Sequence, residues 1–264
     1  MCMSLSKEQI AALAEHLENA ELNAHAVKKI TDDYPDMDFR DAYNVQYEIR
    51  RRKEARGIRI IGMKMGLTSR AKMEQMGVDT PIYGFLADYF ERAESGEISV
   101  KDLIHPKVEA EIAFVTKSPL RGPGCTAAQV IAATDFIMPA VEVIDSRYEN
   151  FRFDLVSVIA DNASSSRFFT GGQVLAPMST DMRTIGVVLE KNGQVMEVGA
   201  SAAVLGNPAT AIAMLANQLA ERDEYIPAGS TILSGAITAA IPVDAGDNVT
   251  LRAHGMGSVS MRFV

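Results

Sequence analysis

The sequence predicts an α+β fold in which a small helical unit precedes a β-rich domain. Two amphipathic helical segments occur before Gly57. From residue 97 onward, apolar residues mostly alternate with polar ones or form short runs, as in strands, and two further helices interrupt this pattern. A length of 264 residues fits one large domain or a main domain with a small appendage. We therefore expect a small N-terminal domain over residues 1–80 and a β-rich domain with the functional site over residues 81–264.

Composition argues against several classes of function. A net charge of −8 at pH 7 argues against nucleic acid as a partner. No apolar run approaches the ~20 residues that a membrane-spanning helix needs, and the charged, amphipathic start of the chain is unlike a signal peptide. The chain has two cysteines, Cys2 and Cys125, which indicate no disulfide framework. We expect a soluble, reduced, cytoplasmic protein with neither nucleic acid nor membrane as a partner.

The first helical segment begins with a capping box, and the second with an aspartate. In Ser6-Lys-Glu-Gln9, the serine and glutamine side chains can each accept a hydrogen bond from the other's backbone N–H. Asp38 can cap the second helix, and Gly57 follows its expected end. The basic run at residues 50–53 suits the end of that helix, where cations complement the helix dipole. We interpret both helices as packing elements. Apolar residues recur at helical spacing at Ile10, Leu13, Ala14, Leu17, Ala42, Val45 and Ile49.

A short buried strand is predicted over residues 58–65, and it contains a lysine. Gly66 breaks this strand, and residues 69–76 can form a short helix that Gly77 stops. Lys64 lies between two methionines, and a lysine inside an apolar run is costly unless it has a partner or a task. The same lysine could instead point outward from the strand into solvent. These residues alone leave both interpretations open.

The segment from Thr68 to Tyr89 contains enough glycine and proline to act as a mobile lid. Asp79 lies in this segment, between Val78 and Thr80. On these residues alone, an aspartate in that position is more typical of a turn cap than of a catalytic group.

A candidate metal site lies in the strand predicted over residues 105–115. Apolar residues alternate there with Glu109 and Glu111, whose side chains therefore share one face, roughly 7 Å apart along the chain. Two carboxylates held that close repel each other, so one takes up a proton or a cation lies between them. Residues 137–145 form a second apolar run with Glu142 in its middle. If the two strands are neighbours, three carboxylates converge.

Three carboxylates without cysteine or histidine favour a hard divalent cation, Mg²⁺ or Mn²⁺, over zinc. The alternative is that Glu109 and Glu111 line the solvated face of an edge strand, which is the commoner meaning of a Glu-x-Glu pair alone. Glu142 lies in a run without polar alternation. That position favours the metal site.

The remaining elements follow in order and suggest no second site. Thr126-Ala-Ala-Gln129 is another capping box and begins a helix. Residues 155–160 are predicted as a strand that ends in the polar turn 161–165, and Asn192-Gly193 indicates a hairpin. Asn207-Pro208 begins another helix. The sequence has no glycine-rich phosphate loop, no nucleophile elbow and no histidines at ligand spacing.

Several short motifs occur together over nearly the whole chain. They are Gly62-x-Lys64-x-Gly66-Leu-Thr68, Gly77-Val-Asp79-x-Pro81, Val108-Glu-Ala-Glu-Ile112, Glu142 and Ala160-Asp-Asn-Ala-Ser164. In combination they resemble the family of 2-hydroxypentadienoate hydratases and 4-oxalocrotonate decarboxylases, which belongs to the fumarylacetoacetate hydrolase-like superfamily. Residues 71–90, residues 143–151 and the C-terminal residues 257–264 are most similar to the decarboxylase branch.

The resemblance implies a mixed-β, partly barrel-like catalytic domain with a small helical N-terminal domain. It also implies a Mg²⁺ or Mn²⁺ site and a set of residues around it. Those residues are the metal ligands Glu109, Glu111 and Glu142, the catalytic groups Lys64 and Asp79, and the substrate contacts Leu67, Ser164 and Thr238.

The resemblance further implies a reaction in the meta-cleavage degradation of aromatic compounds. In it, 2-oxohex-3-enedioate (4-oxalocrotonate) loses CO₂ and becomes 2-hydroxypenta-2,4-dienoate, with the divalent cation as a Lewis acid. We expect Lys64 to orient the substrate or to manage protons. A homologous hydratase is the expected protein partner, because the dienol product is unstable and is the substrate of that enzyme.

Three other functions remain open on the sequence. The first is the hydratase reaction on the dienol, with the same metal and lysine. The second is hydrolysis of a C–C bond in a diketone, which needs a water-activating dyad that we cannot place. The third is a catalytically silent scaffold subunit, against which the intact Lys64 and the three glutamates argue.

Overall fold

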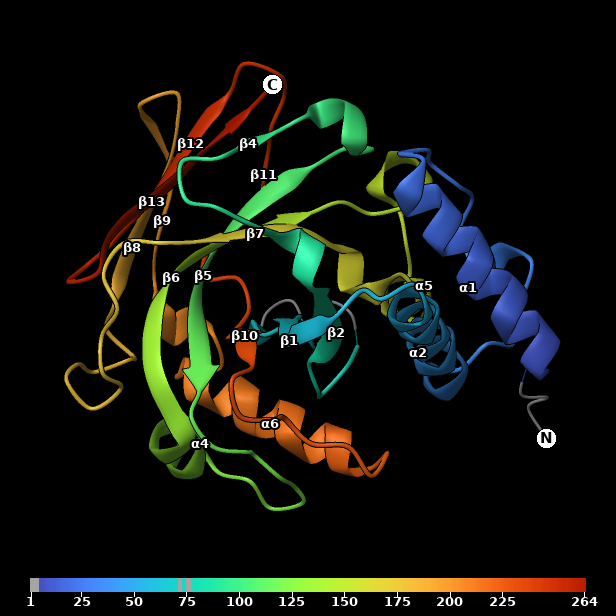
Figure 1. Cartoon of the computed structure of the whole chain (residues 1–264), viewed down its shortest axis with the longest axis horizontal. Coiled ribbons are helices and arrows are strands. Elements are labelled where there is room, and N and C mark those ends of the chain that lie inside the picture. The colour runs from blue at the N-terminus through green and yellow to red at the C-terminus, as the bar shows by residue number, and fades with distance from the viewer. Residues whose placement is uncertain (1–4, 71–72, 75–76) are drawn as a thin grey trace.

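The computed structural model describes residues 5–70, 73–74 and 77–264, and these have the predicted α+β class (Figure 1). Helices α1 (Lys7–Leu22) and α2 (Phe39–Ala55) pack together on one side of the molecule. The Ser6 and Gln9 side chains form the predicted capping box. The Asp38 side chain accepts a hydrogen bond from the Asp41 N–H. Both predicted helix starts are therefore confirmed.

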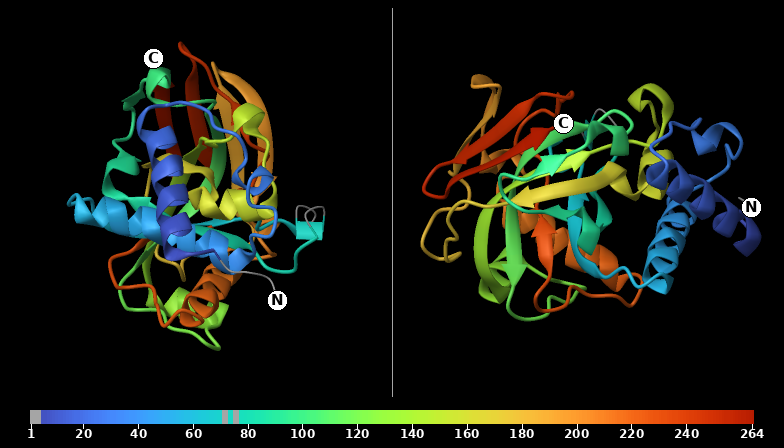
Figure 2. Two further views of the ribbon diagram at one scale, coloured as in Figure 1. Left: turned by 90° about the vertical axis from the view of Figure 1, so that its right-hand side faces the viewer. Right: turned by 45° about the horizontal axis from the view of Figure 1, so that its top comes forward.

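The larger sheet curls into a partly closed barrel (Figures 1 and 2). Seven of its strands follow the order β2-β1-β10-β5-β6-β7-β3. The eighth strand, β11, lies outside this order and pairs with β5. Leu86 of β2 and Phe168 of β7 come from distant positions in that order, yet they pack in one small apolar cluster. This packing draws the two parts of the sheet toward each other. The strands are β1 (Ile60–Gly66), β2 (Ile82–Ala87), β3 (Glu91–Arg92), β5 (Lys107–Thr116), β6 (Thr134–Ile144), β7 (Ser165–Thr170), β10 (Thr231–Leu233) and β11 (Ile241–Pro242).

A second sheet packs against the barrel, with its strands in the order β4-β13-β12-β8-β9. Strands β12 and β13 both contact β6 of the barrel. Helices α4 and α6 contact each other on the other side of the barrel strands (Figure 1). These elements are β4 (Glu97–Ile98), β8 (Gly186–Lys191), β9 (Gln194–Ala200), β12 (Asn248–Ala253), β13 (Gly257–Phe263), α4 (Ala127–Ala133) and α6 (Pro208–Ala220).

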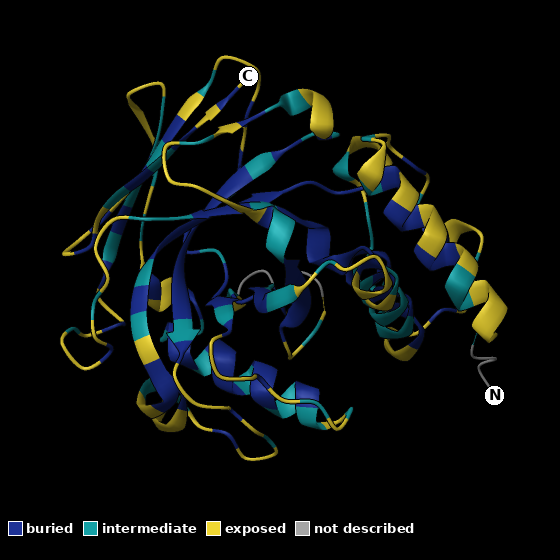
Figure 3. Cartoon of the chain, viewed as in Figure 1, coloured by how far each residue is buried: buried dark blue, intermediate teal, exposed yellow. Residues whose placement is uncertain are grey.

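One apolar core extends from the N-terminal helices into both sheets, and the barrel strands are the most deeply buried part (Figure 3). Strand β1 pairs with β2 and β10, so the segment before residue 80 supplies a strand to the larger sheet. The division into residues 1–80 and 81–264 stays a proposal. Among the described residues, none of the helices is long and apolar enough to cross a membrane.

The prediction of a strand over residues 155–160 was wrong. These residues form helix α5 (Leu155–Ala160), because the Asp154 side chain accepts a hydrogen bond from the Ser157 N–H (2.8 Å) and so caps a first helical turn. β-branched residues with strand preference cannot override that cap in so short a segment. The helix predicted over residues 69–76 lies partly outside the described residues.

A buried acid on α1 joins the two N-terminal helices. Glu18 accepts hydrogen bonds from Arg52 Nε (2.8 Å) and Arg56 Nη2 (2.6 Å), and Lys53 Nζ lies 3.6 Å from Glu18 Oε1. Burial acts to raise the pKa of Glu18, but the three cations outweigh burial and hold that pKa below its ordinary value.

We expect Glu18→Gln to lower the free energy of unfolding by about 2 kcal/mol at neutral pH, between the values typical of exposed and of buried ion pairs. Because the folded-state pKa is lowered, this stabilisation is present above the ordinary pKa of 4.5 and is lost as the pH falls through the folded-state pKa. Urea unfolding of both proteins at neutral pH and at about pH 3 measures the difference. A difference that does not shrink in acid would contradict an electrostatic origin.

Candidate metal centre and substrate cavity

Strands β5 and β6 bring the three glutamates together. Their antiparallel register pairs Glu109 with Glu142 and places Glu111 opposite Ala140. One carboxylate oxygen from each glutamate lies within 4.8 Å of the other two. Glu111 and Glu142 are 0% exposed and Glu109 is 8% exposed. β5 also has a strand on each side. The alternative that these glutamates line a solvated edge strand is therefore wrong.

The carboxylates of this cluster are buried close to one another, so their charged forms are disfavoured. Burial, and then the neighbouring carboxylates, raise the pKa of Glu111 well above its ordinary value. Burial also raises the pKa of Glu142 to about 7, although Lys64 opposes the shift. The Oε1 atoms of Glu111 and Glu142 are buried and accept no hydrogen bond. Buried oxygen ligands without partners fit a hard divalent cation.

Lys64 on β1 lies directly beside the glutamates. Its Nζ is 3.1 Å from Glu142 Oε2 and donates a hydrogen bond to the Ala163 carbonyl oxygen (3.1 Å). The side chain is 4% exposed, so the outward-pointing alternative is wrong. Burial acts to lower the pKa of Lys64, but Glu142, Glu109 and Glu111 outweigh burial and raise that pKa. Lys64 is therefore an ammonium group at neutral pH. With three carboxylates and one divalent cation it would leave the cluster formally neutral.

The Ala163 carbonyl belongs to a turn with unusual backbone geometry. Asn162, Ala163 and Ser164 have φ values of +49°, +51° and +57°, in the left-handed region that costs roughly 1–2 kcal/mol for most residues. Gly84 of β2 allows the turn to come close, because a Cβ there would lie 2.6 Å from the Asn162 carbonyl oxygen. Ser164 is buried, and its Oγ has no hydrogen-bond partner.

Sequence reasoning missed two backbone contributions to the site. One is the Ala163 carbonyl. The other is the Gly235 N–H, which donates a hydrogen bond to Glu111 Oε2 (2.7 Å). Gly235 has φ +109°, and a Cβ there would lie 2.2 Å from Thr68 Oγ1, so only glycine fits. The glycine was a visible signal, but the sequence did not indicate that β10 ends beside Glu111.

A cavity of about 320 Å³ opens beside the glutamates. Leu67 and Thr238, both predicted substrate contacts, line it together with Glu109. Ser164 is not among its lining residues, and Asp79 is exposed in the loop before β2 and does not line it either. The other lining residues are Met65, Gly66, Thr68, Ser69, Glu197, Val198, Ala203, Ala236, Ile237 and Ala239.

A curled mixed sheet with three buried glutamates and a lysine beside a cavity is the arrangement of a metal-dependent enzyme that acts on a small molecule. The family model described as "Fumarylacetoacetate (FAA) hydrolase C-terminal" matches residues 75–264. The chain therefore belongs to the fumarylacetoacetate hydrolase family, and both the resemblance and the fold predicted from it are confirmed.

Similar proteins lie in both branches of the resemblance. The 4-oxalocrotonate decarboxylase of Pseudomonas sp. (strain CF600) is 65% identical over 264 residues, which is 100% of both chains. The 2-hydroxyhexa-2,4-dienoate hydratase of Comamonas testosteroni is 38% identical over 97% of this chain and 98% of its own. The structure of 4-oxalocrotonate decarboxylase from Pseudomonas putida G7, complexed with magnesium and adipate, is 64% identical, with a TM-score of 0.97 over 99% of each chain.

Proposed function

We propose that this protein is a magnesium-dependent decarboxylase that converts 2-oxohex-3-enedioate (4-oxalocrotonate) into 2-hydroxypenta-2,4-dienoate and CO₂ in the meta-cleavage degradation of aromatic compounds. The observation that carries the proposal is the buried cluster of three glutamates and Lys64 beside the cavity. It occurs in a chain 65% identical over its full length to a 4-oxalocrotonate decarboxylase. We also propose a cytoplasmic location, which is supported by the two cysteines, since they indicate no disulfide framework.

Glu109, Glu111 and Glu142 would hold the cation, Mg²⁺ or Mn²⁺, at the inner end of the cavity. Loss of CO₂ breaks the C5–C6 bond and sends its electron pair through the conjugated chain to the C2 oxygen, where a bound cation supplies stabilising positive charge. The Lys64 ammonium lies within the same cluster. It can therefore orient the substrate and donate a proton to the C2 oxygen of the product enolate. Such chemistry needs no covalent cofactor.

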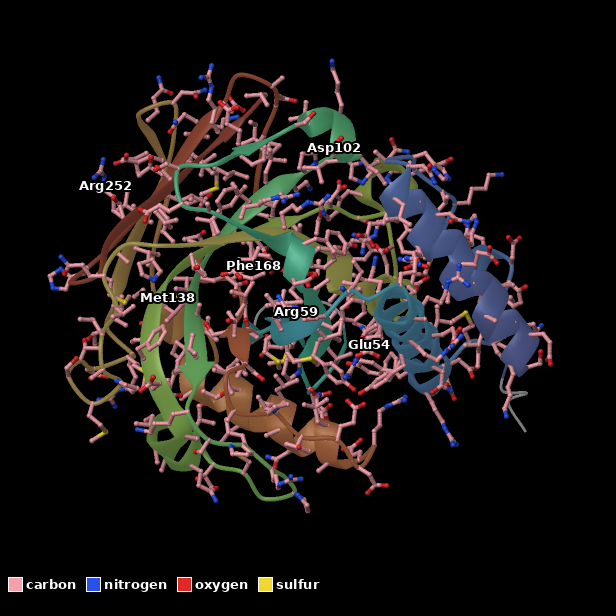
Figure 4. All side chains as sticks on the ribbon, in the orientation of Figure 1. Glu54, Arg59, Asp102, Met138, Phe168 and Arg252 are labelled. Atoms are coloured by element: carbon pink, nitrogen blue, oxygen red, sulfur yellow. The ribbon has the colours of Figure 1, made fainter. Side chains whose placement is uncertain are left out.

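The surroundings of the cluster would strengthen these charge interactions. Phe168 is the β-sheet neighbour of Glu142 and is fully buried, and Figure 4 shows its place on the barrel. Leu233 is the neighbour of Lys64 and is also fully buried. Apolar side chains around the charges keep water out, and electrostatic interactions are stronger in such a site than in water.

The predicted substrate contacts and Asp79 belong to the proposal in different ways. Leu67 and Thr238 would contact the substrate, since they line the cavity. Ser164 would reach the substrate through its unpartnered Oγ. Asp79 is proposed as a catalytic group on the family motif alone, because its place in the exposed loop gives no independent support.

A direct assay distinguishes this function from the hydratase reaction, which the 38% identical relatives make the second candidate. Purified protein with Mg²⁺ is given 2-oxohex-3-enedioate in one reaction and 2-hydroxypenta-2,4-dienoate in another. We expect rapid CO₂ release in the first and slow or no addition of water in the second. Addition of water without CO₂ release would identify a hydratase instead.

We also propose that the protein forms a complex with a homologous hydratase. The dienol product is unstable, so direct transfer to the enzyme that consumes it would avoid loss in solution. Co-expression with the cognate hydratase should give one complex of both subunits in gel filtration at micromolar concentration. Mixing with a more distant member of the family is the control. Separate elution of the cognate pair, with free product in solution, would contradict the proposal.

A further inference from the structure

The Asn162 side chain ties the turn at residues 162–164 to β2. The Asn162 carboxamide accepts a hydrogen bond from the Phe85 N–H (2.8 Å) and donates one to the Phe85 carbonyl oxygen (3.0 Å). Asn162 thereby satisfies both backbone groups of Phe85, as a neighbouring strand would. It is 4% exposed, so water cannot easily replace these bonds.

Without the two hydrogen bonds of Asn162, the turn would relax toward a less strained backbone conformation. Three successive residues are left-handed, and of these only asparagine adopts that geometry readily. Arg147 forms a buried ion pair with Asp161, the residue before the turn, and also donates to the Asp161 carbonyl oxygen. Asn162 in turn holds the turn to β2. It lies next to Gly84, which pairs in register with Lys64 of β1.

The anchored turn fixes one of the partners of Lys64. An ammonium group has three N–H donors. One donates to the Ala163 carbonyl oxygen. Glu142 Oε2 lies 3.1 Å from Lys64 Nζ and is the partner of a second. A Cβ on Gly66 would lie 3.8 Å from Lys64 Nζ, and Gly66 lines the cavity. With two of the three donor directions fixed, the direction of the remaining N–H is fixed as well.

We infer that Asn162 is a positioning residue for Lys64: by tying the left-handed turn to β2, it holds the Ala163 carbonyl where that carbonyl orients the ammonium group. The kinetic consequence rests on the proposed function, since Lys64 acts there on the substrate. The structural consequence, a fixed Lys64 Nζ, does not.

The chain offers a matched control for the loss of a buried carboxamide. Gln46 donates hydrogen bonds from Nε2 to the carbonyl oxygens of Tyr83 (3.0 Å) and Ile159 (2.8 Å). It is buried, and like Asn162 it ties β2 to the segment that contains α5 and the turn. It does not hold the Ala163 carbonyl. Gln46→Ala therefore reproduces the general loss of packing and hydrogen bonding without the proposed effect on Lys64.

The first readout is kinetic. Asn162→Ala should lower kcat by about 10-fold or more and change KM by less than about 3-fold, because an orientation of the ammonium group used in the reaction is lost. Gln46→Ala should keep kcat within about 2-fold even where its melting temperature falls as far as that of Asn162→Ala. An equal loss of kcat in both variants would overturn the inference.

The second readout needs no substrate. In ¹⁵N-lysine-labelled, magnesium-loaded protein, a buried and fixed ammonium group gives a slowly exchanging Nζ–H signal. Lys64→Met assigns the signal of Lys64, and Lys53, which is fully buried against Glu21, serves as the reference in the same sample. Asn162→Ala should broaden or shift the Lys64 signal and leave the Lys53 signal unchanged. Gln46→Ala should change neither.

A Lys64 signal that is unchanged in Asn162→Ala would overturn the inference, whatever the turnover. If the wild-type protein does not decarboxylate the substrate, the proposed function fails, while the ¹⁵N signals still decide whether Asn162 positions Lys64. Should Asn162→Ala fail to fold, Asn162→Gly replaces it, because glycine accepts the left-handed geometry and lacks the carboxamide.

Discussion

Glu111→Gln is expected to abolish turnover and, in the metal-free protein, to raise the stability of the fold. The first effect follows from the loss of a ligand and of a negative charge from the proposed metal centre, and should reach about 1,000-fold in kcat. The second follows because Glu111 is buried beside two other carboxylates, which raises its pKa. Replacing it with a neutral side chain that still accepts from the Gly235 N–H should stabilise the metal-free protein and raise its melting temperature.

Turnover with excess Mg²⁺ and thermal unfolding in a chelator measure these two effects. Glu190→Gln is the control, since Glu190 also lies on a strand but pairs with Arg252. The Arg252 side chain lies at the surface (Figure 4). That variant should keep full turnover. If Glu111→Gln keeps near wild-type turnover, the three glutamates are not the metal ligands. If it lowers the stability of the metal-free protein, the repulsion described for the cluster is not significant.

Lys64→Met should lower kcat by about 100-fold or more with a smaller change in KM. Methionine keeps most of the volume of the side chain, so the barrel packing should survive, but the ammonium group that contacts Glu142 and the Ala163 carbonyl is lost. The kinetics should be measured together with metal content, because the fall in kcat is expected with Mg²⁺ still bound.

Lys53→Met is the matched control, since Lys53 is a buried lysine like Lys64 and pairs with Glu18 and Glu21. It should lose stability without losing kcat in the fraction that remains folded. A Lys64→Met variant with normal kcat and only a raised KM would make Lys64 a simple substrate-binding cation, and its proposed catalytic role would be wrong.

Local sequence patterns were sufficient where one residue or one repeat decides the structure. The capping boxes at Ser6 and Thr126 begin α1 and α4 as predicted. The alternation around Glu109 and Glu111 indicated a strand, and β5 has that strand's pleat. The α5 segment shows the limit of such patterns. Its apolar run suits a strand, but the Asp154 side chain caps a first helical turn, and the strand prediction did not take that aspartate into account.

The interior of the site could be predicted only in part, because its contacts join segments that are distant in sequence. The register that pairs Glu109 with Glu142 depends on the whole β5–β6 ladder. The bond from Lys64 to the Ala163 carbonyl spans 99 positions. It also requires a left-handed turn, for which the sequence offered only a polar cluster that is usually a surface loop. The family resemblance indicated which residues form the site, but the backbone groups that bond to Lys64 and Glu111 could be identified only from the structure.

Removal and return of the metal test the proposed mechanism most directly. The purified protein is treated with a chelator, freed of it, and assayed with 2-oxohex-3-enedioate while Mg²⁺ is added back, with the bound metal counted in parallel by calorimetry. We predict no CO₂ release without metal, recovery of full turnover as one Mg²⁺ binds per chain, and neither binding nor recovery in Glu111→Gln. Full turnover by the metal-free wild-type protein, or recovery in that variant, would contradict a reaction that depends on a cation held by the three buried glutamates.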